Sequence, residues 1–296
     1  MEKQNKAYIF AISAVILWST VATAFKIALV KLDFVQLLFV SSAVASIVLF
    51  FILTLESKLK IAFSISKKEL LQAVFRGALN PFLYYLILFK AYAILPAQEA
   101  MTLNYIWPIM LVLLAVPLLK QKLKIKGLLS VLISFFGVII IATKGDFINL
   151  KLSNLYGDIL AISTSIVWAY FWIVNIKSKI DESIKLFYSF LFGFIFTIPV
   201  VFLFSDFNIE FTASLGAAVY VGVAEMGITF FFWLYALKLS NRTDSVSQLI
   251  FLSPFLSLIF ISTILQEEIH RSTLLGLAFI LGGIFLNKMK TKKKIK

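Results

Sequence analysis

Glu225 is a carboxylate in the middle of a long apolar stretch of the chain. Charged side chains in such stretches are rare and usually face a cavity or a charged partner. Gly222 and Gly227 stand on either side of it and would let another helix or a ligand approach closely. Glu225 is therefore a candidate to bind a proton or an amine. The alternative is a structural carboxylate that pairs with a lysine or hydrogen-bonds to a neighbouring helix.

A second polar cluster precedes Pro108 in another apolar stretch, where Asn104, Tyr105 and Trp107 follow one another closely. Glu99, Thr102 and Tyr105 recur every third residue, which places them within one broad face of a helix. We expect that face to line a cavity. Glu99 also lies near the start of its predicted helix, where a carboxylate is stabilised by the helix dipole, so capping is the alternative there.

Aromatic residues complete the predicted cavity, because aromatic walls with a few polar groups suit a flat or apolar ligand. The alternative for the Trp and Tyr residues is an interfacial belt or helix packing. Pro108 and Pro254 are expected to bend the helices beside it. The predicted lining consists of Trp18, Tyr84, Tyr85, Glu99, Thr102, Asn104, Tyr105, Trp107, Trp168, Trp172, Glu225, Gln248 and Ser253.

The composition indicates the elements that must position these residues. Of the 296 residues, 61% are hydrophobic, well above the fraction of about 45–50% in soluble proteins. This composition predicts an integral membrane protein. The absence of cysteine and the presence of one histidine exclude thiolate metal sites and disulfides and argue against a histidine-built metal site. We expect no metal and no cofactor. The net charge of +13 comes from lysines in short loops, which argues against nucleic acid as a partner.

The apolar stretches predict an all-α fold with ten membrane-spanning helices, because a span needs roughly 20 apolar residues. A capping box from Ser66 to Glu69 is expected to open the third helix. The predicted spans are 7–30, 34–55, 70–91, 97–117, 124–143, 155–176, 184–204, 212–237, 244–264 and 272–289.

Lysine and arginine positions predict the orientation, because positive residues gather in cytoplasmic loops. When the N-terminus is assigned to the cytoplasm, most of the basic residues fall on that side, including those of loop 120–126 and of the tail 290–296. Both termini are then cytoplasmic. Lys26 and Lys90 fall near the outer helix ends, where they can snorkel to the interface or bind a substrate carboxylate.

The two halves of the chain share landmarks at nearly one spacing. Pro108 and Pro254 stand as far apart as Gly137 and Gly283, and Trp18 with Trp168 shows a similar interval. Five spans in each half make the second half enter the membrane from the opposite side. We therefore predict two inverted repeats, 7–143 and 155–289, followed by the basic cytoplasmic tail 290–296.

The chain resembles the ten-span EamA branch of the drug/metabolite transporter superfamily. Leu17-Trp18-Ser19-Thr20 and the segment from Gln98 to Pro108 are similar to YddG-like aromatic amino acid exporters, whereas Gly227 to Lys238 and Leu252-Ser253-Pro254 are similar to EamA sequences in general. The resemblance implies a central cavity lined by both halves and export by alternating access. The family usually has a glutamate after its fourth span; here that place is Lys120-Gln121-Lys122, while Gln266-Glu267-Glu268 follows the ninth span. A simple symmetric gate does not fit this difference.

The leading hypothesis is a secondary transporter in a prokaryotic plasma (inner) membrane that exports small metabolites, with aromatic or neutral amino acids as the expected class. Proton exchange and facilitated diffusion both remain open as driving forces, and uptake remains open as the direction. Multidrug or cation efflux is the alternative transport function. A non-transport membrane protein, such as an enzyme, would need a catalytic cluster on its loops, and the loops are short and rich in lysine. The expected partners are a small-molecule substrate, the lipid bilayer and protons, and the expected state is a monomer or weak dimer.

Overall fold

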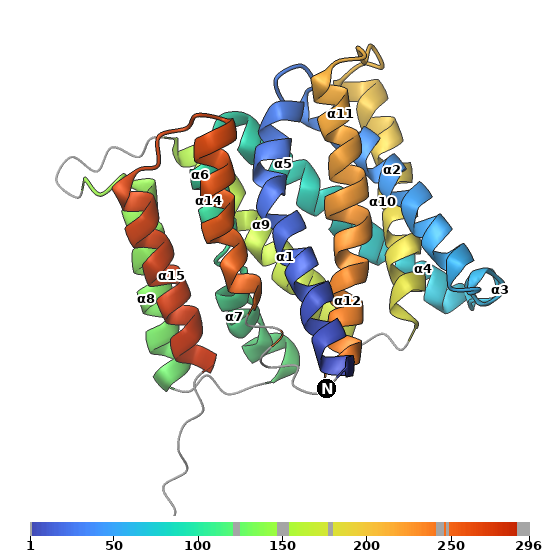
Figure 1. Cartoon of the computed structure of the whole chain (residues 1–296), viewed down its shortest axis with the longest axis horizontal. Coiled ribbons are helices and arrows are strands. Elements are labelled where there is room, and N and C mark those ends of the chain that lie inside the picture. The colour runs from blue at the N-terminus through green and yellow to red at the C-terminus, as the bar shows by residue number, and fades with distance from the viewer. Residues whose placement is uncertain are drawn as a thin grey trace, which may run out of the picture.

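The structure, a computed structural model, describes residues 2–120, 125–146, 154–176, 180–240, 246 and 249–288. These residues form helices that stand side by side with their axes roughly aligned, and they include no strand (Figure 1). Seven helical segments of this part of the chain are long and apolar enough to cross a membrane, judged by length and composition, and three shorter apolar helices accompany them. The chain is therefore an all-helical, multi-pass membrane protein.

The first half of the chain begins with two uninterrupted helices and continues with two interrupted ones. A short helix, α3 (Leu59–Ala62), lies between the second and the third segments. The uninterrupted helices are α1 (Glu2–Ala28), α2 (Phe34–Leu55) and, at the end of this half, α8 (Ile125–Ala142). The interrupted segments are α4 (Lys67–Gly77) with π-helical η1 (Ala78–Leu83) and α5 (Tyr84–Ile94), and α6 (Ala97–Asn104) with α7 (Trp107–Leu119).

The second half repeats this order of uninterrupted and interrupted helices. Its uninterrupted helices are α9 (Leu155–Ile176), α10 (Glu182–Phe204) and α15 (Arg271–Lys288). Its interrupted segments are α11 (Ala213–Tyr220) with π-helical η2 (Val221–Thr229) and α12 (Phe230–Leu239), and 3₁₀-helical η3 (Leu249–Leu252) with α14 (Ser253–Ile264).

Short polar side chains determine where several helices begin. The predicted capping box at Ser66 and Glu69 is confirmed: each side chain binds the backbone N–H of the other residue, and α4 starts at Lys67. Asp33 and Gln36 form a second capping box at the start of α2. Such caps bind backbone donors that lack a partner in the first turn of a helix.

The helices pack in pairs that join the two halves of the chain. Helix α2 packs along α10, and α8 packs along α15. Helix α1 packs against the segments η2, α12 and α14 of the second half, and α9 packs against α5, α6 and α7 of the first. Because α1 and α9 each lie against the other half, the centre of the molecule is built from both.

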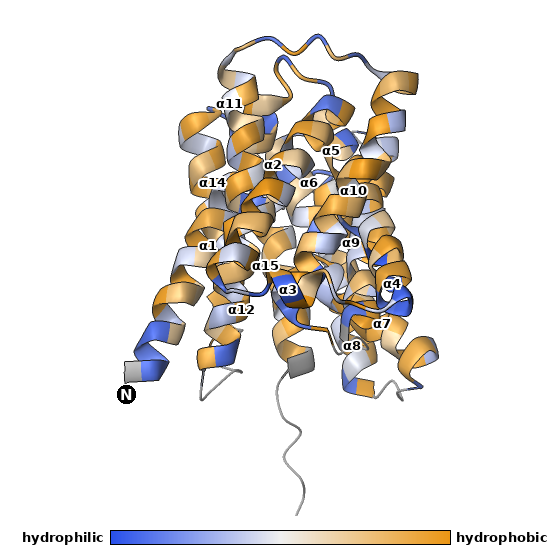
Figure 2. Cartoon of the chain, turned by 90° about the vertical axis from the view of Figure 1, so that its right-hand side faces the viewer, coloured by the Kyte–Doolittle hydropathy of each residue, from blue (hydrophilic) through white to orange (hydrophobic). Residues whose placement is uncertain are grey.

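Large apolar side chains on the outer faces of the helices remain exposed. Phe51, Leu132, Phe202 and Ile259 each expose more than half of their surface. Figure 2 shows that hydrophobic residues cover most of the helix bodies, while many hydrophilic residues lie near helix ends and in the connections. A lipid bilayer is the environment that accepts this much apolar surface, and satisfied helical backbones are what it requires.

Candidate functional site

The candidate site is built where four helical segments are interrupted. In the third segment Asn80 has an extended backbone (φ −147°, ψ 121°) inside η1, and Pro81 follows it. Proline has no N–H to continue a helical ladder, so the interruption has a local cause. In the segment formed by α11, η2 and α12, the interruption is the π-helix η2, which carries Glu225 between Gly222 and Gly227. Such wide turns inside helices occur often at functional sites.

The two proline landmarks lie in the first turn of a helix. Helix α6 ends at Asn104, Tyr105 and Ile106 form a turn, and α7 then begins with Trp107 and Pro108. In the other half, η3 ends at Leu252 and α14 begins with Ser253 and Pro254. Proline is well tolerated in a first turn because the N–H that it lacks has no helical partner there. Each proline therefore starts a new helix after a break.

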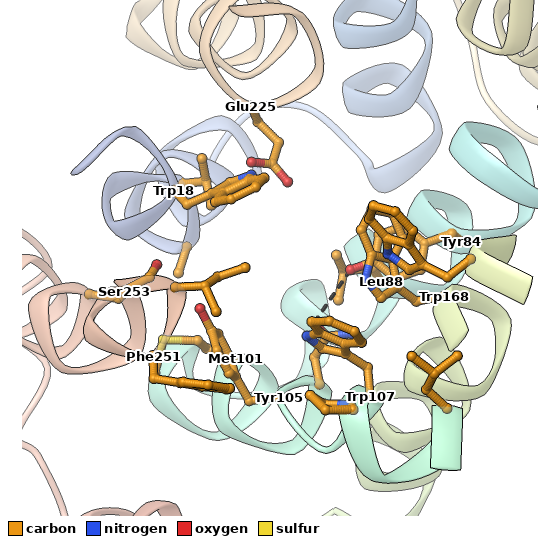
Figure 3. Close-up of a pocket in the computed structure, with 18 of the residues that line it drawn as sticks. Trp18, Tyr84, Leu88, Met101, Tyr105, Trp107, Trp168, Glu225, Phe251 and Ser253 are labelled. Atoms are coloured by element: carbon orange, nitrogen blue, oxygen red, sulfur yellow. Dashed lines mark hydrogen bonds between the residues drawn. The ribbon is translucent and has the colours of Figure 1, made fainter. Parts of the chain in front are cut away.

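A cavity of about 430 Å³ lies among these segments (Figure 3). Its size falls in the range of about 300–1,000 Å³ that is usual for small-molecule sites. Nine of the predicted residues line it, namely Trp18, Tyr84, Asn104, Tyr105, Trp107, Trp168, Trp172, Glu225 and Ser253. Pro108 lines it as well, whereas Pro254 is buried outside the lining.

Glu225 is the only residue with a formal charge among the described residues that line the cavity. It is 8% exposed. The hydroxyl of Tyr85 donates a hydrogen bond of 2.8 Å to its Oε1 atom, and its Oε2 atom is buried without a hydrogen-bond partner. The indole of Trp18 lies beside the carboxylate (Figure 3). The Tyr85 hydroxyl and the Trp18 indole are thus the polar groups next to this carboxylate, and no cationic side chain lines the cavity beside it in the described part of the chain.

Two groups of aromatic rings form the cavity walls. Trp18 packs against Phe230 and Trp233, with ring centroids 5.9 and 5.4 Å apart. Trp168 packs against Tyr84 at 4.8 Å and against Phe230 at 5.8 Å. Edge-to-face and tilted contacts of this kind hold aromatic rings in defined positions. The walls are therefore rigid surfaces that can stack on a ring or attract a cation.

Polar atoms lie at a few points between these rings. Asn104 donates to Thr164 Oγ1 at 2.7 Å and accepts a longer hydrogen bond, 3.3 Å, from the Tyr84 hydroxyl. The side chains of Tyr105 and Ser253 point toward one another from opposite halves of the chain (Figure 3). Ser257 lines the cavity one turn after Ser253, and its hydroxyl has no hydrogen-bond partner. The cavity therefore combines apolar walls with a small set of donors and acceptors.

Three of the predicted lining residues lie elsewhere. Tyr85 is fully buried behind Glu225, to which it donates. Glu99 and Thr102 are buried on α6, which packs against α9. The expectation that Glu99, Thr102 and Tyr105 share one lining face therefore holds only for Tyr105, because the helix ends at Asn104 and the face before it packs on a neighbouring helix. Gln248 lies outside the described residues.

Several lining residues were missed from the sequence. Phe230, Trp233, Tyr92 and Phe251 line the cavity, and nothing in their local sequence distinguishes them from packing residues. Ser257 could have been found, because it follows Ser253 at the spacing that places two side chains on one helix face.

Lys26 and Lys90 do not line the cavity. Lys26 donates to the carbonyl oxygens of Tyr92 and Leu95, at 3.0 and 3.1 Å, and so caps the end of α5. Lys90 lies over the ring of Phe34 at 4.7 Å. Neither is placed to bind the carboxylate of a ligand in the cavity.

Glu267, the glutamate that follows the ninth predicted span, binds the start of α6. Its carboxylate accepts hydrogen bonds from the backbone N–H groups of Ala97 and Gln98, at 2.8 and 3.1 Å. The Gln98 side chain returns a bond of 2.7 Å to the carbonyl oxygen of Glu268. A connection of the second half thus docks on a helix start of the first half, as a carboxylate at a helix N-terminus favours.

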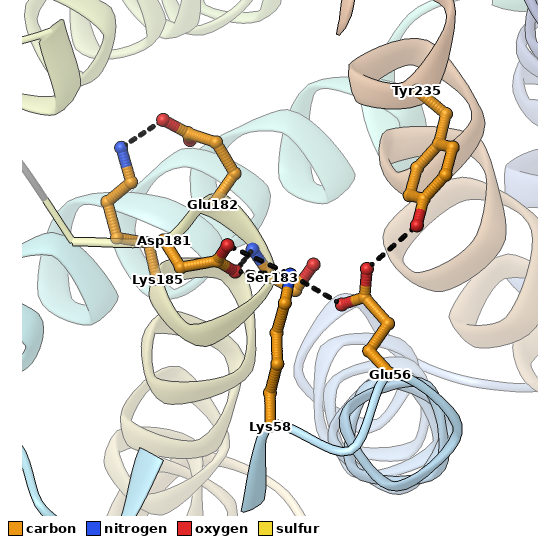
Figure 4. Close-up of polar contacts among 7 residues, drawn as sticks. All are labelled: Glu56, Lys58, Asp181, Glu182, Ser183, Lys185 and Tyr235. Atoms are coloured by element: carbon orange, nitrogen blue, oxygen red, sulfur yellow. Dashed lines mark hydrogen bonds and ion pairs between the residues drawn. The ribbon is translucent and has the colours of Figure 1, made fainter. Parts of the chain in front are cut away.

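Another polar cluster, formed by Glu56, Lys58, Asp181 and Tyr235, joins the two halves (Figure 4). Lys58 Nζ lies 2.8 Å from Asp181 Oδ2 and 3.1 Å from Glu56 Oε2, and Tyr235 donates to Glu56 at 3.0 Å. Burial lowers the pKa of the Lys58 amine, but the hydrogen bonds and charges of Asp181 and Glu56 outweigh it and raise the pKa overall. Lys58 therefore stays charged and bridges α2 to the start of α10.

The fold and the cavity define a multi-pass helical membrane protein with a central site built from both halves of the chain. The sequence pattern of the EamA-like transporter family matches residues 5–143 and again residues 155–289. The chain belongs to this family of transporters, as the resemblance to drug/metabolite transporters implied.

Individual relatives add to this assignment. An uncharacterized transporter of Archaeoglobus fulgidus is 29% identical over 180 residues, which cover 58% of this chain and 61% of that protein. The match thus spans less than two thirds of that relative. A solved structure, described only as the crystal structure of a protein, has a TM-score of 0.66 at 17% identity and covers 96% of each chain. At this identity the likeness shows a shared fold.

Proposed function

We propose that this protein is a secondary transporter that exports small amine-bearing metabolites, with aromatic or neutral amino acids as the substrate class, by alternating access. The observation that carries this proposal is the cavity with one carboxylate, Glu225, among aromatic walls. A carboxylate binds an ammonium group through a charge-assisted hydrogen bond. The rings of Trp18 and Trp168 offer surfaces for a flat side chain.

The proposal includes ten spans arranged as two inverted repeats, 7–143 and 155–289. Packing at two glycines supports it. A Cβ atom added to Gly77 would lie 2.7 Å from the carbonyl oxygen of Ser189, and one added to Gly222 would lie 2.6 Å from the carbonyl oxygen of Ser41. In both contacts a glycine that precedes or opens a π-helical segment meets a serine carbonyl in the long helix of the other half.

The pair α8 and α15 offers a second matching contact. A Cβ atom on Gly137 would meet the carbonyl oxygen of Gly276 at 2.5 Å, and one on Gly283 would meet that of Ser130 at 2.5 Å. Reciprocal contacts of this kind are what two related halves produce when they pack about a common axis. Carriers of this design place their site at the interface of the repeats, often where helices are discontinuous.

The proposed orientation places both termini in the cytoplasm of a prokaryotic cell, with the protein in its plasma membrane. The lysine-rich loops support it through the positive-inside rule. The tail 290–296 lies outside the described residues. Transport would need the lipid bilayer and the substrate as partners, with the protein acting as a monomer or weak dimer, and with protons as the candidate coupling ion.

The motifs that resemble YddG-like exporters contribute residues to the cavity. Trp18, Asn104, Tyr105, Trp107 and Pro108 all belong to the quoted motifs, and all line the cavity. An aromatic amino acid would place its ring among the tryptophans and its amine at Glu225. Its carboxylate would have Asn104 and the hydroxyls of Tyr105 and Ser253 as neutral partners.

The second candidate is efflux of organic cations. It is favoured by the absence of any Lys or Arg among the described residues that line the cavity, because a free carboxylate on the substrate would have no cationic partner. A carboxylate in an aromatic box attracts a cation both directly and through the ring faces. Competition between amino acids and a lipophilic cation separates the two candidates.

Flux into proteoliposomes tests the proposal. A panel of amino acids, and tetraphenylphosphonium as the cation, are each offered with and without an imposed pH gradient. Saturable amino acid flux without the gradient supports a facilitative carrier, and flux that needs the gradient supports proton coupling. Saturable flux of the cation alone, above its flux into protein-free liposomes, favours the second candidate, and no saturable flux of any of these compounds overturns the proposed substrate class.

A further inference from the structure

Asn80, in η1, is a buried polar side chain with no partner. It is fully buried, and neither its amide nitrogen nor its amide oxygen forms a hydrogen bond. Buried side-chain amides in proteins are normally bonded, and an unbonded one calls for an explanation such as strain or function. A purely structural asparagine at a helix break would use its amide to bind the freed backbone groups, and this one does not.

Asn80 occupies the place in the first half that Glu225 occupies in the second. Each residue stands three positions after a glycine, Gly77 or Gly222, that meets a serine carbonyl of the opposite half. Asn80 stands at the kink inside η1, with an extended backbone, and Glu225 stands within the π-helix η2. The two residues differ in one respect: Glu225 lines the cavity and Asn80 does not.

The segment η1 is closely packed in this structure. A Cβ atom added to Gly193 of α10 would lie 2.3 Å from Pro81 Cγ, so the ring of Pro81 sits directly on the α10 backbone. The segment η2 is packed as closely against α2, because Cβ atoms added to Gly222 and Gly227 would lie 2.6 and 2.8 Å from side-chain atoms of Val44 and Val48. Both segments therefore lie closely against the long helix of the opposite half, and they differ in that Glu225 lines the cavity and Asn80 does not.

We infer that Asn80 is a second substrate contact, which enters the cavity only when the carrier faces the opposite side of the membrane. This inference rests on the proposed transport function. When the two inverted repeats exchange conformations, η1 adopts the position relative to the cavity that η2 has in this structure, and Glu225 leaves the cavity. The substrate amine then meets a neutral amide in place of a carboxylate. Binding of the amine is weaker in that state, which favours release of the substrate there.

The absence of cysteine makes a labelling test direct. Three single-cysteine variants in membranes are treated with N-ethylmaleimide: Asn80→Cys, the cavity residue Ser253→Cys, and the control Ser189→Cys. Ser189 is 2% exposed and packs against Gly77, so it is buried next to the same segment. The labelling rate of a buried thiol reports the fraction of time that it spends exposed.

The expected result is labelling of Ser253→Cys through the cavity that it lines, at a rate that an amino acid substrate lowers. Labelling of Asn80→Cys should be roughly tenfold faster than that of Ser189→Cys, in keeping with a minor state populated at some per cent. If Asn80→Cys reacts as slowly as Ser189→Cys while substrate still protects Ser253→Cys, the inference is overturned and the transport proposal stays intact. Absence of protection in Ser253→Cys together with absence of flux overturns both.

A second variant separates function from structure. Asn80→Leu removes the unbonded amide and puts an apolar side chain in its place. A substrate contact predicts flux reduced at least several-fold with a melting temperature that is unchanged or raised, because no hydrogen bond is lost in this state. A lower melting temperature with normal flux in the surviving protein assigns Asn80 a structural role and contradicts the inference.

Discussion

The segments η1 and η2 hold matching places in the two halves but differ in backbone and in chemistry, because η1 contains the extended residue Asn80 whereas η2 is an uninterrupted π-helix. Each is accompanied by a glycine that packs on a serine carbonyl of the opposite half. In η1 the polar residue is Asn80, buried beside Pro81, whereas in η2 it is Glu225, which faces the cavity and receives a hydrogen bond from Tyr85. Packing restricts the backbone at both segments, but it does not determine which polar residue stands there, so this residue can differ between the halves.

This difference indicates how a doubled fold acquires a single charged site. A carboxylate on both segments would place two like charges near the centre of a membrane, where each charge is costly. One carboxylate and one amide give each half of the chain a polar group, and the free-energy cost of burying them is smaller than that of burying two carboxylates. Substitutions of Glu225 and Asn80 should therefore affect transport unequally, whereas substitutions of Gly222 and Gly77 should lower stability equally.

The largest expected effect is at Glu225. Glu225→Gln keeps the shape of the side chain and removes its charge, so flux of an amine-bearing substrate should fall about 10–100-fold, the equivalent of a charge-assisted hydrogen bond of about 1.5–3 kcal/mol. Initial rates in proteoliposomes measure this. The matched control, Glu210→Gln, changes an exposed glutamate in a connection and should leave flux unchanged. Normal flux in Glu225→Gln would remove the carboxylate from the mechanism.

The second prediction concerns the shared packing. Gly77→Ala and Gly222→Ala each introduce a methyl group less than 3 Å from a backbone oxygen of the opposite half. Overpacking of this kind costs about 1–3 kcal/mol. Both variants should therefore lower the thermal stability of the purified protein by similar amounts.

Gly282→Ala is the control for these variants, because a Cβ atom there has no neighbour within 4 Å. It should leave the melting temperature unchanged or raise it slightly, since alanine favours a helix more than glycine does. A large loss of stability in Gly222→Ala together with none in Gly77→Ala would contradict the proposed equivalence of the two segments.

The smallest expected effects are those of substitutions at two neighbouring tyrosines, Tyr85 and Tyr84. Tyr85→Phe removes the 2.8 Å hydrogen bond to Glu225 and should reduce substrate affinity about fivefold, the equivalent of about 1 kcal/mol. Tyr84→Phe removes a longer bond, 3.3 Å, to Asn104 and should have a smaller effect. Affinity measured from the concentration dependence of flux decides the order, and a larger effect at Tyr84 would weaken the case for Glu225 as the anchor.

Much of the fold could be predicted from the sequence. The apolar stretches predicted the helices, and the capping box at Ser66 predicted the start of α4 to within a few residues. Glu225 was singled out because a charge in an apolar stretch is rare, and the structure places it in the cavity. These features depend on local composition and spacing, which are written directly in the chain.

The lining of the cavity could be predicted only in part. Glu99 and Thr102 share the helical spacing of Tyr105 but lie on α6, which packs against α9, because the helix breaks at Asn104. Trp233 lines the cavity although nothing in its local sequence distinguishes it from packing residues. Which face of a helix meets a cavity depends on the neighbouring helices and on where each helix is interrupted, and neither can be read from periodicity alone.

The sequence by itself determined that the chain is helical and spans a membrane, because apolar stretches of this length are stable only in lipid, and it identified the residues able to carry charge there. Only the tertiary structure decided that Glu225 faces the cavity while Asn80 is buried without a partner. The physical reason is that exposure to a cavity is set by contacts between distant segments, such as Pro81 on Gly193, and these contacts exist only once the two halves have packed together.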